Sequence, residues 1–455
     1  MLNKNYYLYH STSKYDRASG RSKKVSHYIG RLTPTGVIEK KRELYAAWEY
    51  GNSELIYGVS SDLLDALRKS FFDRWRELYA LSVTRLLGWS PMQYARDRWE
   101  KLHLARVVDA HLSPNILGDV LREVGRDPRS QVQFFRSLPS GGNQVAVGLS
   151  STRSDIAGIA EEWHSVEHSP RVPPMNFVLV HSLETGLPLF MKQIPDPVID
   201  FKSMMPALEE ARFSGTVVLG RGAWSCQPTE ALSSRTNFLL PLSRSVQGVD
   251  YARKLDVHFT YRDRGVRATS YQEGKCRVYL FEDLKDHAEE ATALIRQIRE
   301  GRRSADAYRE SEPAFGKIAV ITNLRSDPEQ LYHLYKQRED LLEAFDSMRR
   351  WPEVDRTILR DEEAVAGYFF ISFLSLYLYY RVLALIRRAD LLGKLSVNEL
   401  LLRLSKVYEI QASGRSMLSN VPDEVERLDE SLGTGLFRRD PWSAVTPIRK
   451  ARETS

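Results

Sequence analysis

Cysteine is scarce in this chain, and we expect no secretion signal at its start. Only Cys226 and Cys276 occur among 455 residues, and their spacing suits neither a zinc knuckle nor a disulfide framework. The N-terminus, which begins Met1-Leu-Asn-Lys-Asn-Tyr6, shows no apolar core of signal-peptide length. We therefore expect a protein of a reducing compartment, the cytoplasm, and not a secreted one.

Several common catalytic and nucleotide-binding motifs are also absent. The sequence has no phosphate-binding glycine loop and no dinucleotide fingerprint, so nucleotide hydrolysis has no support. Ser150, Ser151 and Thr152 follow a strand-like segment, but no Gly-x-Ser-x-Gly turn accompanies them. No fixed-period repeat or low-complexity tract is present, and 42% of residues are hydrophobic, as in a globular protein. At this length we expect roughly two to four packed units.

Positive charge is present but unevenly placed. Residues 1–50 hold ten Lys and Arg against four Asp and Glu, which equals the whole net charge of +6. The same segment alternates in strand fashion around Ser19-Gly20, as in a β-hairpin. A basic arm on a neutral body suits a phosphate backbone, although an anionic membrane or simple solubility would produce the same pattern. The candidate DNA-binding residues of this arm are Arg17, Arg21, Lys23, Lys24, Arg31, Lys40, Lys41 and Arg42.

One apolar segment approaches the length of a membrane span. Ala364 to Tyr380 is a run of 17 residues without a charge, preceded by acids at 361–363 and ended by Arg381. Acids before the run and a base after it are the charge order of a helix. A membrane helix and a helix buried in a large protein are both compatible with this pattern. We expect the buried helix, and no membrane partner.

Changes in residue pattern predict how the chain is organised. Apolar residues recur at helical spacing from about 60 to 137, and Ser113-Pro114 is a helix-start pair. After a Gly-rich linker at 140–143, short apolar runs predict strands at 144–148, 177–181, 187–192, 216–220 and 317–322, and a helix follows at 328–350. Strands followed by helices indicate the α/β class. A charged, strand-like stretch at about 227–315 is expected to interrupt this core rather than extend it.

The predicted units follow from these changes. They are a basic β-hairpin arm (1–50), a helical DNA-binding or dimerisation domain (51–140), an α/β core (141–226 and 316–400), a β-rich insertion (227–315) and a C-terminal helical tail (401–455).

The predicted helix at 328–350 carries a family resemblance. Its residues Tyr335-Lys-Gln-Arg338 and Leu342-Glu-Ala-Phe345-Asp-Ser-Met-Arg349 resemble the signature of DDE-type insertion-sequence transposases of the superfamily numbered four. In that signature a Tyr and an Arg are followed by a catalytic Glu and a Lys. Tyr335 and Arg338 match, Leu342 stands at the Glu position, and Arg349 is the basic residue. The neighbouring Glu343 is one place out of register, about 100° around the helix.

Two upstream segments resemble the same family. Thr216-Val-Val-Leu-Gly220-Arg221-Gly222 is similar to the strand and turn that carry the second catalytic Asp, with Gly220 at its place. Gln144-Val-Ala-Val-Gly148 is similar to the strand that ends in the first Asp, with Gly148 at its place. The resemblance covers the chain from the basic hairpin to about residue 385. It implies an RNase H-like core with a β-rich insertion between the second and third acids.

The resemblance implies a chemistry that these residues do not support. Active relatives cleave DNA and join the freed 3′ hydroxyl to a target with two Mg or Mn ions, which carboxylates hold. Gly148, Gly220 and Leu342 offer no carboxylate, so we expect no catalytic residue, no bound metal and no cofactor. A displaced site built on a nearby acid such as Asp155 or Glu343 is the less favoured alternative.

Other polar residues allow two interpretations each. Arg221, Arg338 and Arg349, with Tyr335, either grip DNA phosphates or serve as ion-paired supports. Arg299, Arg302 and Arg303 form a second basic cluster, either a DNA contact or a solvated helix end. For His164, His168 and His181 we expect ordinary surface or core positions rather than a metal site.

The leading hypothesis is a catalytically inactive, transposase-derived protein of the cytoplasm that binds double-stranded DNA at the nucleoid. It would be domesticated or regulatory, and a homodimer or the partner of a host protein. The alternatives are an active DDE transposase with a displaced metal site, a structural or interaction protein without DNA binding, and the product of a decaying gene.

Overall fold

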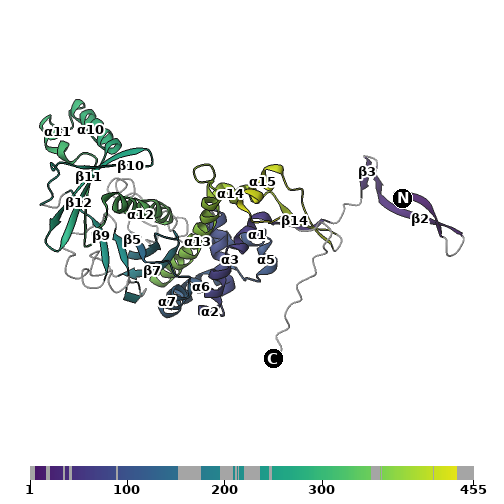
Figure 1. Cartoon of the computed structure of the whole chain (residues 1–455). Helices are drawn as coiled ribbons and strands as arrows, with labels where there is room; N and C mark the ends of the chain where they lie inside the picture. The colour runs from purple at the N-terminus through teal and green to yellow at the C-terminus, as the bar shows by residue number, and fades with distance from the viewer. Residues whose placement is uncertain are drawn as a thin grey trace.

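The structure is a computed structural model, and its elements are drawn in Figure 1. It describes residues 6–16, 21–33, 36–39, 44–88, 91–151, 176–194, 209–210, 213, 215–219, 236–244, 248–349, 359, 361–412 and 415–437. Within these ranges the protein is a mixed α/β molecule, as the sequence predicts, and three sheets are present.

The centre of the molecule is a mixed sheet in which nine strands of the described residues take part. Its core strands lie in the order β7-β6-β5-β8-β9, with β5, β8 and β9 parallel and β6 antiparallel to β5. This order and these directions are those of an RNase H-like sheet, so the fold predicted from the resemblance is confirmed. The core strands are β5 (Gln144–Ser151), β6 (Asn176–Ser182), β7 (Pro188–Ile194), β8 (Thr216–Leu219) and β9 (Asn237–Pro241).

The insertion does not interrupt this sheet, and the prediction is wrong on that point. Strand β13 (Lys317–Thr322) pairs with β9 on one side and with β12 (Cys276–Asp283) on the other. Strands β11 (Arg264–Glu273) and β10 (Val257–Tyr261) then continue the same sheet to its edge. The sheet grows in this direction because β9 would otherwise leave a row of unpaired backbone groups.

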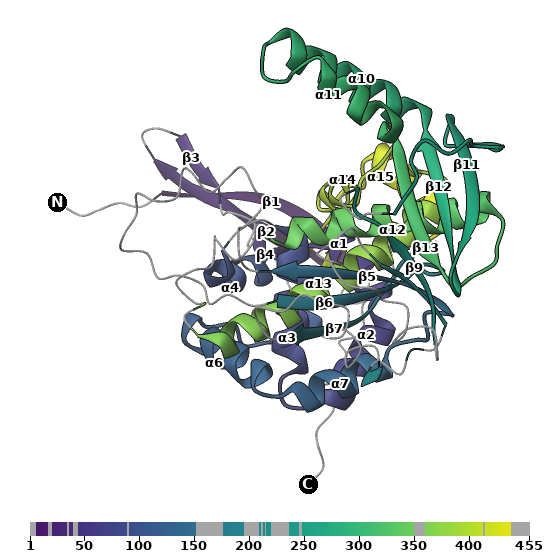
Figure 2. The same cartoon turned by 90° about the vertical axis from the view of Figure 1, so that its left-hand side faces the viewer.

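Two helices follow the added strands. Helix α10 (Leu284–Arg299) begins where Asp283 accepts hydrogen bonds from the backbone of Lys285 and Asp286, and the short α11 (Asp306–Ser311) follows it. Figure 2 shows this pair projecting beyond the sheet. Neither helix buries a residue. The insertion is therefore β-rich only as far as the end of β12 at Asp283, and helical after it.

One long helix covers one face of the sheet near its centre. Helix α12 (Pro328–Arg349) packs against β5, β8, β10 and β11. Its residues Leu331, Tyr332 and Tyr335 share a buried cluster with Val218 of β8 and with Leu239 of β9. Because side chains alternate along a strand, the neighbouring Val217 and Phe238 enter the other, larger cluster.

Helix α13 (Glu362–Arg388) contains the apolar run, and it packs against α3, α6 and β7. By length and composition it could cross a membrane, and 72% of its most apolar window is buried inside the protein. The helix therefore lies in the core, as the sequence predicts. It joins the sheet to the helices α1 (Gly51–Gly58), α2 (Ser61–Ser70), α3 (Trp75–Leu87), α4 (Ala95–Trp99), α5 (Leu104–Val107), α6 (Pro114–Gly125) and α7 (Pro128–Ser137).

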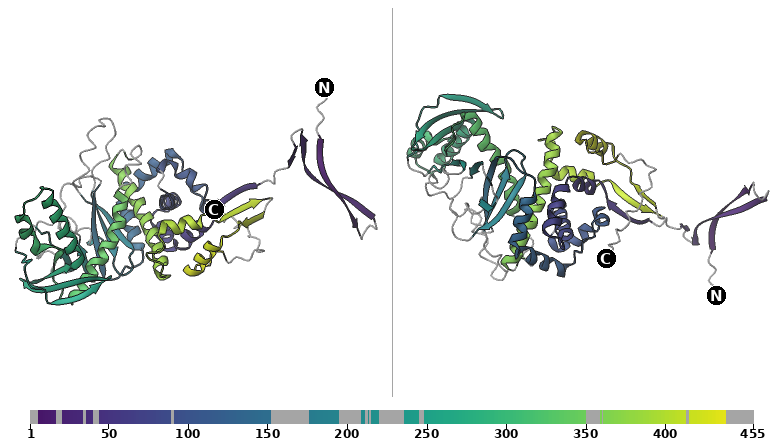
Figure 3. Two further views of the ribbon diagram at one scale, coloured as in Figure 1. Left: turned by 90° about the horizontal axis from the view of Figure 1, so that it is seen from above. Right: turned by 60° about the horizontal axis from the view of Figure 1, so that its bottom comes forward.

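The predicted N-terminal hairpin is present and stands apart from the body, as Figure 3 shows. It comprises β1 (Tyr6–Asp16) and β2 (Arg21–Thr33), and β3 (Gly36–Glu39) adds a third strand. The hairpin turn lies outside the described residues. None of the side chains described in these three strands is buried.

A third sheet joins the two halves of the sequence. Strand β4 (Leu44–Glu49) pairs with β14 (Tyr408–Ala412), which also pairs with β15 (Arg415–Leu418). Helices α14 (Val397–Leu404) and α15 (Asp423–Leu432) flank these strands. The end of the predicted arm and the predicted helical tail are thus held together by backbone hydrogen bonds, which no local pattern in either segment indicates.

Candidate functional site

Gly148 lies in β5 and is buried in the centre of the sheet. The parallel pairing of β5 with β8 is described up to the pair Val147 and Leu219, directly before Gly148 and Gly220 in the sequence. Gly148 comes two residues after Ala146, which is the partner of Val218. It therefore faces the same side of the sheet as Val218, which is the side that α12 covers.

Leu342 lies in α12, the helix that packs across β5 and β8. The first and third positions of the expected acid set are thus on elements in contact. Gly220 and Arg221 lie outside the described residues, as do the side chains of Leu342 and Arg349.

The donor chemistry of these positions does not fit a divalent metal ion. Mg²⁺ takes hard oxygen ligands. Gly148 and Gly220 have no side chain and Leu342 has an apolar one. Among the described residues, no three His, Cys, Asp or Glu side chains are close enough to hold a metal ion. Asp155 and the side chains of Glu339, Asp340 and Glu343 lie outside the description.

Tyr335 and Arg338 are buried on α12. Tyr335 is 0% exposed and Arg338 is 5% exposed, and the guanidinium lies 5.5 Å from the centre of the Tyr335 ring. A phosphate at the protein surface has little access to side chains that are covered to this extent. Burial therefore favours the supporting role for these two residues over the role of gripping DNA.

The structure describes only some of the basic residues of the arm. Lys24 and Arg31 lie on β2 and are exposed. Arg21 and Lys23 also lie on β2, with side chains outside the description, and Arg17, Lys40, Lys41 and Arg42 lie outside it altogether. In the second basic cluster, Arg299, Arg302 and Arg303 are all exposed around the end of α10.

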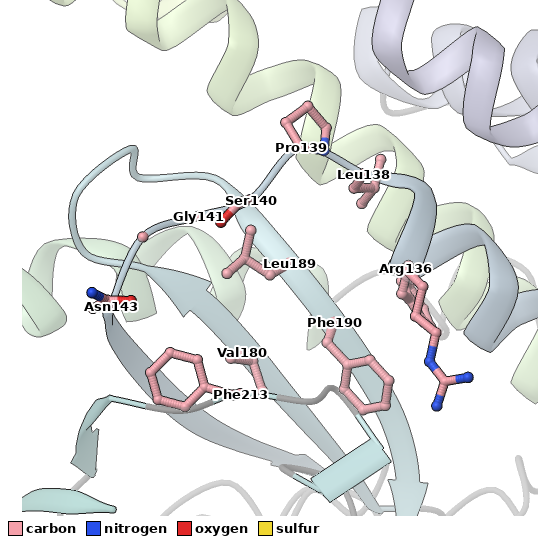
Figure 4. Close-up of a pocket in the computed structure, with 12 residues that line it drawn as sticks. Arg136, Leu138, Pro139, Ser140, Gly141, Asn143, Val180, Leu189, Phe190 and Phe213 are labelled. Atoms are coloured by element: carbon pink, nitrogen blue, oxygen red, sulfur yellow. The ribbon is translucent and has the colours of Figure 1, made fainter.

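A cavity of about 390 Å³ lies beside the start of β5. Figure 4 shows Leu138, Leu189, Phe190 and Phe213 around it, beside the linker that leads into β5. None of the described residues that line this cavity carries a carboxylate. The cavity is therefore separate from Gly148, and its described lining offers no carboxylate for acid–base or metal chemistry.

His181 on β6 is a core histidine, as the sequence predicts. Its side chain is 1% exposed, it packs edge-on against Tyr380, and neither ring nitrogen has a hydrogen-bond partner among the described residues. Burial of this kind lowers the pKa of His181 to about 3, so the imidazole is neutral. His164 and His168 lie outside the described residues.

A group of tyrosines on the arm is the feature that sequence reasoning missed. Tyr7, Tyr9 and Tyr28 are 54%, 54% and 37% exposed. The Tyr28 ring centre lies 6.1 Å from that of Tyr7 and 5.3 Å from that of Tyr9. The available signal was the run Tyr6-Tyr-Leu-Tyr9, which on a strand with nothing packed against it must expose aromatic rings.

Comparisons with known proteins add little to this geometry. No protein-family model matches the chain, and no curated protein matches it. Among solved structures, the piggyBac transposase synaptic complex with hairpin DNA is similar over 78% of this chain and 70% of that chain. The sequence identity is 11% and the TM-score is 0.36. Similarity at this level says nothing about activity or partners.

Proposed function

We propose that this chain is a transposase-derived DNA-binding protein that has lost metal-dependent cleavage. It binds double-stranded DNA without a divalent ion and serves as a regulator or a recruited module in the cytoplasm. The observation that carries this proposal is the placement of Gly148. It stands on an RNase H-like sheet, on the face that α12 covers, where an acid would be needed.

Charge supports the DNA-binding half of the proposal. The arm carries the net positive charge of the chain, and Lys24 and Arg31 are exposed on β2. Lysine and arginine on a β-ribbon bind phosphates through counterion release, which needs no metal and no particular base sequence. In the described strands of the arm, Asp16 and Glu39 are the only acids.

A binding titration tests the DNA-binding half of the proposal. It measures how the full chain binds a fluorescent duplex of about 30 base pairs in EDTA at several salt concentrations. We expect binding to persist in EDTA. The logarithm of the association constant should fall linearly with the logarithm of the salt concentration. The variant Lys24→Gln/Arg31→Gln should reduce the salt slope by about 2. A matched control, Lys101→Gln/Lys394→Gln, removes two exposed lysines from the body and should change the slope less.

The result also separates the alternatives. Absence of duplex binding at low salt would leave a structural or interaction protein. A parallel assay of plasmid nicking with Mn²⁺ should show no cleavage above the metal-only control. Nicking that requires both protein and Mn²⁺ would contradict the loss of activity and favour a displaced metal site.

A further inference from the structure

One face of the arm brings aromatic, basic and hydroxyl side chains together. The Oγ atoms of Ser11 and Ser26 are 2.9 Å apart, so these two side chains lie on one face of the hairpin. Tyr9 is paired with Tyr28, two residues from each serine, and belongs to the same face. A β-bulge separates the pair of Tyr7 from the pair of Tyr9. The Tyr7 ring nevertheless contacts the Tyr28 ring, so Tyr7 lies on the same face.

Cations stand at both ends of this face. Ser13 is paired with Lys24 at one end, and Tyr7 is paired with Arg31 at the other. Lys24 and Arg31 are exposed. The stripe from Lys24 to Arg31 is roughly 24 Å long at about 3.4 Å per strand residue. We call this surface the tyrosine face, defined by Tyr7, Tyr9, Tyr28, Lys24, Arg31, Ser11 and Ser26, and none of these residues is acidic.

We propose that the tyrosine face binds a single-stranded segment of DNA by stacking unpaired bases on Tyr7, Tyr9 and Tyr28. This inference deepens the proposed DNA-binding function and rests on it. Exposed aromatic rings beside cations are the combination that binds single-stranded nucleic acid, with rings against bases and cations against phosphates.

Unpaired bases fit this face better than a duplex groove. Bases inside a duplex are already stacked on one another, and groove readers contact base edges through hydrogen-bonding groups. Rings that are about half exposed gain contact area only from bases whose planes are free. The arm also has no core layer in its described residues, and small sheets of this kind are marginally stable alone, so a bound strand would supply the missing layer.

The proposal predicts that ring removal affects single strands selectively. The probes are a fluorescein-labelled oligothymidylate of about 12 nucleotides and a mixed-sequence duplex of about the same length. The full-chain variant Tyr9→Leu/Tyr28→Leu keeps apolar bulk but loses the rings, and should bind the single strand at least about tenfold more weakly. Duplex binding should change little. The variant Tyr9→Phe/Tyr28→Phe keeps the rings and should bind the single strand as the wild type does.

Two controls keep the result interpretable. Tyr57→Leu/Tyr94→Leu removes two exposed tyrosines from the helical body and should leave single-strand binding unchanged. Photo-crosslinking of the unmodified chain to an oligonucleotide with 5-iodouracil does not depend on any variant folding. It should attach the DNA to Tyr7, Tyr9 or Tyr28.

Three outcomes would overturn the inference: wild-type single-strand binding by the leucine pair, an equal loss of duplex and single-strand binding, or crosslinks confined to the body. These are distinct from failure of the proposed function. A chain that binds the single strand through its tyrosines but no duplex would refute double-stranded binding and leave the tyrosine face standing.

Discussion

At the scale of single residues, His181 shows how a buried group that has no hydrogen-bond partner among the described residues links folding to pH. Its pKa is about 3 in the folded protein, because burial disfavours the imidazolium, and about 6.5 in an unfolded chain. Below pH 6.5 the unfolded state therefore binds a proton that the folded state does not. Stability is unaffected by this group above that pH and falls as the pH drops toward 3.

We expect His181→Leu to remove this acid sensitivity. The wild type should lose up to about 1.4 kcal/mol per pH unit through this group on the acid side. Melting temperatures of the wild type and the variant, measured from pH 7 to pH 4, check the prediction through their difference. The exposed His258→Gln is the control. Parallel curves for wild type and His181→Leu would show that His181 finds a partner in solution.

At the scale of elements, the crossing of α6 and α13 depends on glycine. A Cβ atom at Gly367 would lie 2.0 Å from the carbonyl oxygen of Leu121, and one at Gly125 would lie 1.9 Å from that of Glu363. Real Cβ atoms do not approach backbone this closely. The two helices pack through these glycines, and the ion pair of Arg122 with Asp361 reinforces the crossing at 2.7 Å.

Gly367→Ala should destabilise the protein even though alanine favours a helix by about 1 kcal/mol over glycine. Overpacking of backbone against Cβ costs roughly 1–3 kcal/mol or more. The control is Gly58→Ala, where nothing lies within 4 Å of the added atom and no loss is expected. The check is the denaturant concentration at the unfolding midpoint of each variant, compared with that of the wild type. An unchanged midpoint for Gly367→Ala would contradict the close crossing of α6 and α13.

A second element-scale contact holds the third sheet to the helices. His103 lies 3.1 Å from Glu54 of α1 through Nδ1 and 3.0 Å from Glu409 of β14 through Nε2. Burial alone would lower the pKa of His103, but its hydrogen bonds to Glu409 and Glu54 raise it to about 9. Burial alone would raise the pKa of Glu409. The hydrogen bond and charge of His103 and the charge of Arg106 outweigh burial and lower the pKa of Glu409 to about 2.

The stabilisation from His103 should therefore disappear in alkali. A raised pKa stabilises the folded state fully below the unfolded value of about 6.5 and less as pH rises to about 9. His103→Gln should lower the melting temperature at pH 6.5 by several degrees and by much less at pH 9.5. The exposed His10→Gln serves as control. An equal loss at both pH values would show that packing, and not charge, explains the effect.

At the scale of the whole molecule, β5, β8 and α12 are far apart in the sequence and pack against one another. The family resemblance puts three catalytic acids in or next to these elements, at Gly148, Gly220 and Leu342. Restoring them together, as Gly148→Asp/Gly220→Asp/Leu342→Glu, should create a response to divalent ions. We expect a lower melting temperature without metal, because three carboxylates repel one another, and a rise with Mg²⁺ or Mn²⁺. The wild type should respond no more than ionic strength explains.

The neutral set Gly148→Asn/Gly220→Asn/Leu342→Gln controls for size and should not respond to metal. A divalent-specific rise in the wild type would mean that other ligands hold a metal. A triple-acid variant without any response would mean that the three positions do not converge.

The sequence determined by itself those features that are local. Apolar runs of strand length predicted β5, β6, β7, β8 and β13 to within three residues at each end, because a buried strand must be apolar on both faces. The helix at 328–350, the apolar α13 and the start of α6 at Pro114 followed from spacing and helix-start residues in the same way. The sequence also shows that residues 148, 220 and 342 are Gly, Gly and Leu, and their reading as replaced acids is a prediction that rests on the resemblance.

Tertiary structure alone decided what depends on distant partners. Strand β9 falls within the range assigned to the insertion, yet it pairs with β8 in the core, and β10–β12 extend the sheet beyond it. Strands β4 and β14 pair although they are far apart along the chain. Burial of Arg338 and exposure of Tyr9 run against the usual behaviour of these residue types, because what packs on a side chain comes from elsewhere in the fold. Strand pairing and side-chain burial depend on contacts between distant segments. The local sequence of one segment does not show which other segment will pack against it.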